Sequence, residues 1–450
     1  MTGPTWREVV DDRPQDRRFR VRRDIFSDPG LFAGELEALF EGGWVYLAHA
    51  SQLPGPNDYV TTHMGRRPVV VMRGADGVAR AFLNACPHKG AIICPLPRGN
   101  APLHVCAYHS WSFASDGTQK AVKAKSVGGY TEQFLAERQD LTPIVRFAEY
   151  RGFYFGSLNS DVPTLEEYLG DAAFFIDLIV DQGPEGAELV PGVSAYTYRG
   201  NWKLQLENCS DGYHVTSVHP TYLAIAERRA REGNGDGVSG VWDRSSGSLE
   251  DTVGAVEYGS FRFANGHVAI WSAAPAMPGH PLFAARDELV ARVGPLRARW
   301  MFYARNLTIF PNLQIADNFA SQIRVIRPLA PDRTEMTTYC VGPRGEAAAA
   351  RRTRLRQYED FYNPSGMATP DDLIVYEACQ MTDDAARDTW QSYERGMAVQ
   401  QDGTNEVARE LGIKPVASIK GPGQLWDETV LHAYYRAWSD RMARAEGARL

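Results

Sequence analysis

The sequence predicts an α+β fold in which a small all-β domain precedes a larger domain that mixes strands and helices. Three observations lead to this prediction. Strand-like apolar runs separated by Asp-Gly turns occupy residues 46–158. Apolar residues at helical spacing come before them, and further strand-like runs among helical patterns come after them. We expect an N-terminal helical lead over residues 1–44, an all-β domain over 45–160, and a domain over 161–450 with a central antiparallel sheet covered by helices.

The first elements are indicated by local signals. From Asp24 to Trp44 the apolar residues recur at roughly 3.6-residue spacing, and a double Gly ends this helical pattern. Next, RRPVVVMRG and VARAFLNA are typical of two strands joined by an Asp-Gly turn. YHSWSF is expected to be a strand that enters a second Asp-Gly turn, and EYRGFYFGSL an aromatic-rich strand that closes the domain.

The larger domain begins after a turn cluster and a helix start, NSDVPTLEEYLGD. AYTYRGNWKLQLEN is expected to be a strand that enters a helix. Strands of an antiparallel sheet are expected in ARNLTIFPNLQI, QIRVIRPLA and RTEMTTYCVGP. The polar, Gly- and Ser-rich residues 226–251 predict a mobile surface loop.

Residues 369–390 predict a long helix. The start Thr-Pro-Asp-Asp supplies a cap residue, a proline in the first turn, and acids at the positive end of the helix dipole. The apolar stripe of this helix is expected to be buried, and it consists of Ile374, Ala378, Met381 and Ala385.

Composition and charge exclude several classes of protein. A net charge of -7 gives no attraction to nucleic acid or to an anionic membrane, and no apolar run is long enough to span a bilayer. The N-terminus lacks the apolar segment of a secretory signal. The six cysteines are sparse and irregularly spaced, which argues against a secreted disulfide scaffold and favours the cytoplasm.

Two Cys-His pairs lie close together in the all-β region. Cys86 and His88 are separated by one residue, and after seventeen residues Cys106 and His109 follow, separated by two. A 2Fe-2S Rieske cluster has one iron bound by two Cys and one bound by two His. Because each loop would then give one ligand to each iron, such short gaps within each pair favour this cluster.

Two other interpretations of these pairs remain open. A structural zinc site also uses Cys and His, although two to four residues usually separate its paired ligands. Alternatively, the four side chains are buried without binding a metal. Cys94 and His104 lie in the same stretch but outside the paired pattern, and we expect them to be structural.

A second group of metal-ligand residues lies in NWKLQLENCSDGYHVTSVHP. Asp211 and His214 are three residues apart and are expected on one helix face. His219 precedes Pro220, which biases it away from helix, so we expect it just past the helix end, where it can approach His214. Two His and one carboxylate form the facial triad of non-haem Fe(II) oxygenases.

The carboxylate of this triad must come from a distant part of the chain. Asp371 and Asp372 are candidates. Because acids are common in the first turn of a helix, the residues alone favour a structural role for both.

The chain resembles the large subunits of Rieske non-haem iron ring-hydroxylating dioxygenases, and within them the benzoate, toluate and anthranilate 1,2-dioxygenases. The pairs match the family pattern of Cys-x-His, about seventeen residues, then Cys-x-x-His. The resemblance extends through FEGGWVYLAHASQLPGPNDY, GNWKLQLENCSDGYHV and RQYEDFYNPSGMATPDD. The departures are Ser110, where a Gly commonly precedes the Trp, and Lys89, where Arg is common.

The resemblance implies roles for individual residues. Asp372 corresponds to the carboxylate ligand of the mononuclear Fe(II), which His214 and His219 would also bind. Asp211 would relay electrons by linking His214 to His109 of a neighbouring subunit. Asn208 would line the substrate pocket. The motif around the carboxylate ligand is matched here by Gly366, Asp371, Asp372, Glu377 and Gln380.

The resemblance also implies an activity and partners. NADH electrons would arrive through a separate reductase with a flavin and an iron–sulfur cluster, and the subunits would assemble as α3β3 with a small β subunit. O2 would then dihydroxylate an aromatic carboxylate at C1 and C2 to give a cis-diol carboxylate. The alternatives are a Rieske dioxygenase or monooxygenase acting on anthranilate, salicylate or another substituted aromatic acid, a demethylase, a Rieske electron carrier, and a zinc-stabilised binding module.

Overall fold

The computed structural model of the 450-residue chain describes residues 5–232, 256–318, 321–422 and 426–447. The chain divides into two compact units, residues 39–165, and residues 1–38 together with 166–450. The first unit is built almost entirely of strands and the second of helices and antiparallel strands, which confirms the α+β class. The division into 1–44, 45–160 and 161–450 stays a prediction about domains.

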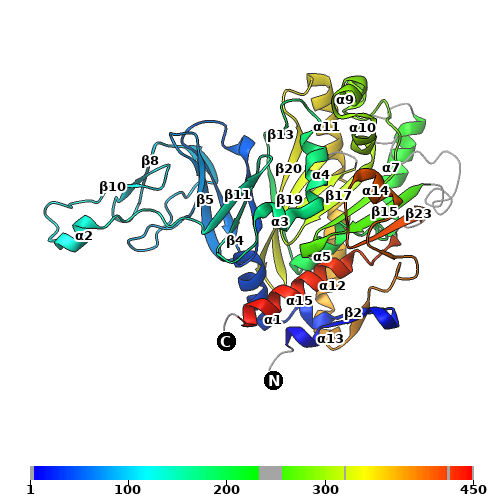
Figure 1. The fold of residues 1–450 in the computed structure, drawn as a ribbon, viewed down its shortest axis with the longest axis horizontal. Coiled ribbons are helices and arrows are strands. Elements are labelled where there is room, and N and C mark those ends of the chain that lie inside the picture. The colour runs from blue at the N-terminus through cyan, green and yellow to red at the C-terminus, as the bar shows by residue number, and fades with distance from the viewer. Residues whose placement is uncertain (1–4, 233–255, 319–320, 423–425, 448–450) are drawn as a thin grey trace. The chain divides into compact units, whose positions relative to one another are not determined.

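The unit of residues 39–165 contains three antiparallel sheets (Figure 1). One has the order β6-β5-β4-β7, the second β11-β12-β3 and the third β10-β9-β8. The strands are β3 (Val45–His49), β4 (Asp58–Met64), β5 (Arg67–Arg73), β6 (Ala79–Leu83), β7 (Arg98–Asn100), β8 (Leu103–Val105), β9 (Ser112–Ala114), β10 (Gln119–Ala121), β11 (Arg146–Tyr150) and β12 (Phe153–Ser157), and the short helix is α2 (Glu132–Ala136).

The predicted hairpin of this unit is present. Strands β5 and β6 pair with Arg73 opposite Ala79, and Gly77 takes a φ of +78°, which the turn between them requires. Strand β5 is buried on both faces, because Val69, Val70 and Val71 are all inaccessible to solvent. The loops that carry the Cys-His pairs therefore extend from a rigid framework.

A large antiparallel sheet forms the centre of the second unit (Figure 1). Its order is β13-β20-β19-β18-β17-β16-β15-β23-β22, and β14 also pairs with β20. The strands are β13 (Ala187–Leu189), β14 (Ser194–Tyr198), β15 (Glu257–Arg262), β16 (Val268–Ser272), β17 (Ala304–Ile309), β18 (Leu313–Asp317), β19 (Ser321–Ala330), β20 (Arg333–Pro343), β22 (Gln401–Asp402) and β23 (Ala417–Pro422).

Helices cover this sheet. Helix α5 packs against β19, α11 against β19 and β20, and α4 against β20. The helices of this unit are α1 (Pro29–Glu35), α3 (Leu165–Leu169), α4 (Ala173–Val180), α5 (Trp202–Asn208), α6 (Val215–Val218), α7 (Pro220–Arg231), α9 (Arg286–Val293), α10 (Pro295–Phe302), α11 (Ala348–Phe361), α12 (Thr369–Met381), α13 (Asp383–Ala386), α14 (Glu406–Leu411) and α15 (Leu431–Gly447).

A buried carboxylate fixes the position of α5. Glu35 of α1 accepts hydrogen bonds from Lys203 Nζ at 2.5 Å and from the indole nitrogens of Trp202 and Trp438 at 2.8 Å each. A buried ion pair needs such additional bonds to offset the loss of hydration. The cluster joins α1, α5 and α15, and it holds the helix that ends at Asn208.

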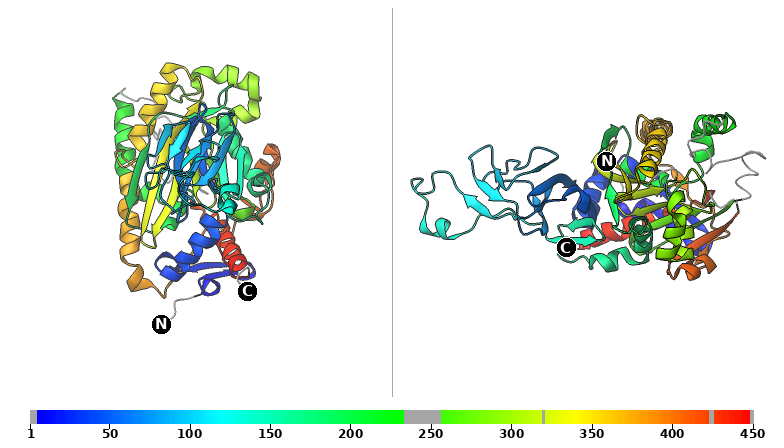
Figure 2. Two further views of the ribbon diagram at one scale, coloured as in Figure 1. Left: turned by 90° about the vertical axis from the view of Figure 1, so that its left-hand side faces the viewer. Right: turned by 90° about the horizontal axis from the view of Figure 1, so that it is seen from above.

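The N-terminal lead is α-helical only in its second half and begins with short 3-10 helices and two strands, which corrects the sequence expectation. Strands β1 (Val10–Arg13) and β2 (Arg18–Arg22) form a sheet with β21 (Trp390–Ser392), and the predicted helix is α1, which Asp28 caps. The N-terminal strands lie beside the C-terminal helix α15 (Figure 2), where Arg436 pairs with Asp12 at 2.6 Å. The third strand of the sheet, β21, is distant in sequence from β1 and β2, so local periodicity does not reveal this sheet.

Two other expectations for this unit are also corrected. The predicted long helix is divided into α12 and α13, and its apolar stripe of Ile374, Ala378, Met381 and Ala385 is exposed instead of buried. The buried face of α12 carries Thr369, Asp372 and Tyr376. Of the predicted mobile loop 226–251, residues 226–231 belong to helix α7, and residues 233–251 lie outside the described residues.

Candidate metal centres and the cavity beside them

The two Cys-His loops of the unit 39–165 have the same backbone pattern. The N–H of Cys86 donates to the carbonyl of Ala91, and the N–H of Gly90 donates back to Cys86, both at 2.8 Å. Likewise Cys106 N–H donates to Trp111 at 2.7 Å, and Ser110 N–H donates to Cys106 at 2.9 Å. Gly90 and Ser110 both have positive φ, +75° and +59°, which closes the two turns.

The side chains of these loops converge. Cys86 and Cys106 are free, buried thiols, and burial together with the neighbouring Cys106 raises the pKa of Cys86. The rings of His88 and His109 lie 4.6 Å apart, and His88 stacks on Trp111 at 4.7 Å. The Nδ1 atoms of both histidines are buried and have no hydrogen-bond partner among the described residues.

This donor set fits a 2Fe-2S Rieske cluster. Two thiols and two imidazole nitrogens are the ligands such a cluster uses. The unpartnered Nδ1 atoms of His88 and His109 are accounted for if they bind a metal, since a buried polar atom without a partner is costly. Cys94 and His104 lie outside this group and contact each other, with 3.3 Å between Sγ and Nδ1.

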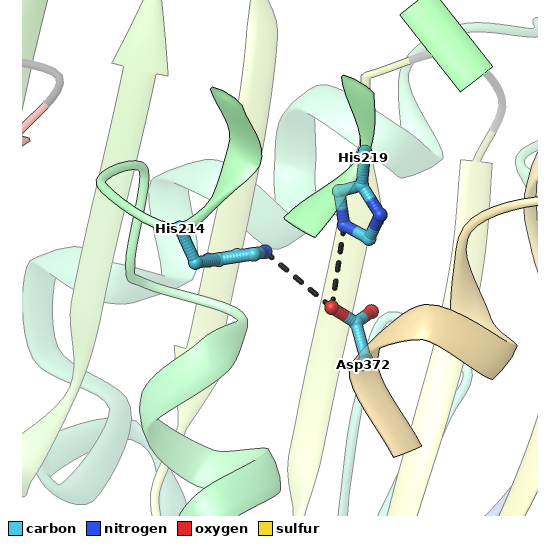
Figure 3. A group of neighbouring side chains, drawn as sticks. All are labelled: His214, His219 and Asp372. Carbon is cyan, nitrogen blue, oxygen red and sulfur yellow. Dashed lines mark ion pairs between the residues drawn. The ribbon is translucent and has the colours of Figure 1, made fainter. Parts of the chain in front are cut away.

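The second group of metal-ligand residues is brought together in the large unit. Nε2 of His219 lies 3.2 Å from Oδ1 of Asp372, and Nε2 of His214 lies 3.6 Å from the same oxygen (Figure 3). One ligand atom from each residue falls within 4.8 Å of the others. The three side chains can therefore meet at one metal ion on one side, which is the arrangement of a facial triad.

Local sequence explains how these three residues are presented. His214 and His219 flank the four-residue helix α6, and Pro220 begins α7, so His219 lies past the helix end as expected. Asp372 lies in the first turn of α12. At Gly366, before this helix, a Cβ atom would lie 2.1 Å from the carbonyl oxygen of Tyr362, so the loop requires glycine here.

The electrostatics favour an ionised Asp372. Burial alone would raise its pKa, yet the hydrogen bond with His219 and the nearby charges of His214 and Arg324 hold the pKa below the usual value. An ionised carboxylate is the form that binds a metal ion.

Asp211 contacts the opposite side of the His214 ring. Oδ2 of Asp211 lies 3.2 Å from Nδ1 of His214, while Oδ1 accepts from the backbone N–H of Tyr213 at 2.7 Å. The segment from Asp211 to His214 is irregular and not the expected helix face. The carboxylate thereby keeps the proton on Nδ1 and leaves Nε2 unprotonated, which is the form that can bind a metal.

Asn208 ends α5 at the same place. Its Nδ2 lies 3.1 Å from Oδ1 of Asp372 and 3.1 Å from Nε2 of His214. The amide therefore donates to the carboxylate of the triad. Asn208 lies in the wall of the cavity beside the triad, and its role in lining the substrate pocket stays a prediction.

This cavity is small and largely apolar. Its volume is about 110 Å³, the same order as the roughly 150 Å³ of an apolar cavity that holds benzene. His214, His219 and Asp372 open onto it. The apolar part of its wall includes Tyr258, Ile270, Trp271, Ala304, Ala316 and Phe361. The size and lining are those of a site for a single ring.

Two family models match the chain. The model of the ring hydroxylating alpha subunit (catalytic domain) matches residues 187–444, which is more than half of the chain. The chain belongs to this family. The model of the Rieske 2Fe-2S domain matches residues 43–134, which decides between the cluster and the zinc alternative. The protein is thus the large subunit of an aromatic ring-hydroxylating dioxygenase, and the resemblance seen in the sequence is confirmed.

Individual relatives match over nearly the whole chain. Toluate 1,2-dioxygenase subunit alpha of Pseudomonas putida is 42% identical and covers 98% of this chain and 97% of its own length. Anthranilate 1,2-dioxygenase large subunit of Acinetobacter baylyi is 40% identical over 90% of this chain and 86% of its own length. A solved structure of naphthalene 1,2-dioxygenase with indole in its active site has a TM-score of 0.79 at 27% identity, covering 94% and 92% of the two chains.

The family also establishes the cofactors. Ring-hydroxylating dioxygenases of this type carry a Rieske cluster and a mononuclear non-haem iron, and a reductase supplies their electrons. The described helices include none with the length and apolar character needed to cross a membrane.

Two features of the site cannot be predicted from the sequence. The contact between Asn208 and Asp372 joins residues that are 164 positions apart and meet only in the folded chain. No local pattern selects a cation for the cavity, because the chain contains 48 Lys and Arg residues in total. The fold places two of them, Arg305 and Arg324, in the cavity wall.

Proposed function

We propose that this large subunit dihydroxylates a benzoate-like aromatic carboxylate at C1 and C2. The supporting observation is the single-ring cavity beside His214, His219 and Asp372 in a chain 42% identical to a toluate 1,2-dioxygenase subunit. One O2, two electrons from NADH and two protons would convert the acid into a cis-diol carboxylate. The electrons would arrive through a separate reductase that carries a flavin and an iron–sulfur cluster.

The proposal assigns each functional residue a task. Cys86, Cys106, His88 and His109 hold the cluster in residues 45–160. His214, His219 and Asp372 hold the iron in residues 161–450. When bound, the two centres supply electron transfer and O2 activation.

The remaining tasks belong to the chain itself. Asp211 holds a proton on Nδ1 of His214, and it would reach His109 of a neighbouring subunit. Asn208 orients the carboxylate of Asp372. The apolar wall that contains Trp271 and Phe361 excludes water and holds the ring against the triad.

The proposed assembly is α3β3, with three small β subunits. Two relatives are named as subunit alpha and as large subunit, that is, as components of multi-subunit enzymes, which supports a partner chain here. The proposed location is the cytoplasm, where a reductase with NADH is available and where six free thiols stay reduced.

The test is the reaction of the reconstituted system with labelled O2. The holoprotein, its small subunit, a reductase and NADH would be given benzoate under ¹⁸O₂, with toluene as a neutral comparison substrate. A cis-diol carboxylate with two labelled oxygens supports the proposal. A singly labelled phenol would replace it with a monooxygenase, and a protein that oxidises no aromatic acid would contradict it.

The second candidate substrate is an aminobenzoate. It is favoured by the 40% identity to an anthranilate 1,2-dioxygenase large subunit. In that case the diol would collapse to catechol with loss of CO2 and ammonia. Release of ammonia from anthranilate at a higher kcat/KM than oxidation of benzoate would establish it.

A further inference from the structure

Arg324 is a buried cation in the wall of the substrate cavity. It lies on β19 of the central sheet and is 8% exposed. The cavity that it lines is the one onto which His219 and Asp372 open. Its charge also helps to lower the pKa of Asp372. The guanidinium is therefore close to the triad and within the same cavity.

The guanidinium has few partners. Its Nε donates to Oε1 of Gln322 at 2.6 Å, and its Cζ lies 5.2 Å from the ring centre of Tyr362. Within the described parts of the chain, no ion pair and no hydrogen bond of its two terminal nitrogens is found. These four N–H donors are thus available to a ligand.

A second arginine in the same wall provides the contrast. Arg305 forms an ion pair with Asp317 and donates to the carbonyl of Tyr303 at 2.7 Å. Its charge is already neutralised by a carboxylate. Among the residues that the structure describes, Arg324 has no such partner, although a buried charge without one is costly. The cavity therefore contains a preformed site for one anion.

Hydrogen bonds among neighbouring side chains hold the orientation of Arg324. Gln322, which accepts from Arg324, donates its own Nε2 to Oδ1 of Asn363 at 3.2 Å. Thr338 donates to the same oxygen at 2.7 Å. This chain of bonds fixes the plane of the guanidinium, which matters because a carboxylate binds it with two parallel N–H···O bonds.

We propose that Arg324 binds the carboxylate of the aromatic acid and that Gln322 positions it. This inference rests on the proposed function, which supplies the carboxylate. In a 1,2-dioxygenation the carbon that bears the carboxylate is itself oxidised, so the anchoring cation must lie close to the triad. Arg324 satisfies this requirement, and a cavity of about 110 Å³ leaves room for one ring between the guanidinium and the metal ligands.

The test compares an acid with its neutral isostere. Binding of benzoate and of benzamide to the anaerobic holoprotein would be measured by calorimetry for wild type, Arg324→Gln and Arg324→Lys. Loss of a charge-assisted pair predicts about 10- to 100-fold weaker benzoate binding in Arg324→Gln, partial rescue in Arg324→Lys, and benzamide binding within about twofold of wild type. Arg327→Gln, on the same strand but paired with Glu335 outside the cavity, is the matched control and is expected to bind both ligands normally.

Other outcomes would contradict the role of Arg324 as the binding site of the carboxylate, which is called the anchor below. Equal losses for benzoate and benzamide in Arg324→Gln would show a structural role only. A wild-type protein that binds benzamide as tightly as benzoate would also reject the anchor, whether or not the variants fold. If wild type binds benzoate through Arg324 but oxidises no aromatic acid, the proposed function fails and the anchor stands. If wild type oxidises benzoate and Arg324→Gln retains the same KM, only the anchor fails.

Discussion

The carboxylate of Asp211 lies 3.2 Å from Nδ1 of His214, on the side of the ring opposite to Asp372. The imidazole therefore lies between two carboxylates, with a hydrogen bond to Asp211 at Nδ1 and with Asp372 3.6 Å from Nε2. Burial lowers the pKa of His214, but Asp211 and Asp372 together raise it above its usual value. A proton held between Asp211 and Nδ1 leaves Nε2 as the ligand atom.

Asp211→Asn should slow turnover without emptying the metal sites. The amide keeps the size of the side chain but removes the charge that holds the Nδ1 proton, and loss of such a partner typically costs 10- to 100-fold in activity. Turnover would be followed by NADH-coupled O2 uptake, and iron by elemental analysis, with about three irons per chain expected in the variant. Turnover at the wild-type rate would show that Asp211 is not needed for electron transfer.

Asp372→Asn should lose the mononuclear iron and keep the cluster. Iron content is expected to fall from about three to about two per chain, while the visible spectrum of the cluster stays unchanged. Asp371→Asn is the matched control. Its carboxylate lies 3.6 Å from Nδ1 of His219, too far for a hydrogen bond, and its iron content is expected to remain near three. The reverse result would transfer the ligand role to Asp371.

Local signals in the sequence predict the turns between strands and the position of His219 just past the end of a helix. The turns at Gly77 and at the Cys-His pairs depend on backbone preferences that act within a few residues. His219 lies past a helix end because Pro220 follows it. The residues alone could not select Asp372, because a carboxylate in a first helical turn is common, and only the folded sheet brings α12 to α6.

Two of the differences between sequence and structure have related physical causes. The sequence predicts a buried stripe of Ile374 and Met381 on α12, because apolar faces usually pack inward. In this helix the inward face carries Asp372 and Tyr376, so the polar residues that build the site take the buried positions. Arg324 was missed for a related reason: nothing local shows which face of a strand meets a cavity.

Ser110→Gly should stabilise the second Cys-His loop. Ser110 has a φ of +59°, where a side chain costs about 1 kcal/mol that glycine avoids, partly offset by the greater freedom of glycine in the unfolded chain. A net gain of up to about 1 kcal/mol is expected, seen as a higher temperature for loss of the visible cluster absorbance. The reverse change, Gly90→Ser, should lower that temperature, since Gly90 has a φ of +75° with open space around a Cβ. A lower temperature for Ser110→Gly, or a higher one for Gly90→Ser, would reject backbone strain as the cause.

Glu207, next to Asn208, should make stability depend on pH. Burial raises its pKa to about 7 from 4.5, although the hydroxyls of Tyr393 and Tyr435 both donate to its carboxylate. The folded chain then holds this proton more tightly than the unfolded chain. The contribution of Glu207 to the free energy of unfolding therefore falls as pH rises from about 4.5 to about 7, by on the order of 3 kcal/mol. Above that range it is constant.

Glu207→Gln should remove this dependence. The amide keeps an oxygen that both tyrosines can bond and carries no charge to bury, so the variant is expected to gain stability over wild type at pH 8 and to match it more closely near pH 5. Urea unfolding followed by tryptophan fluorescence at both pH values measures the difference. Glu288→Gln, exposed on α9, is the control and should leave the wild-type dependence intact. A wild-type slope in Glu207→Gln would assign the titration to another group.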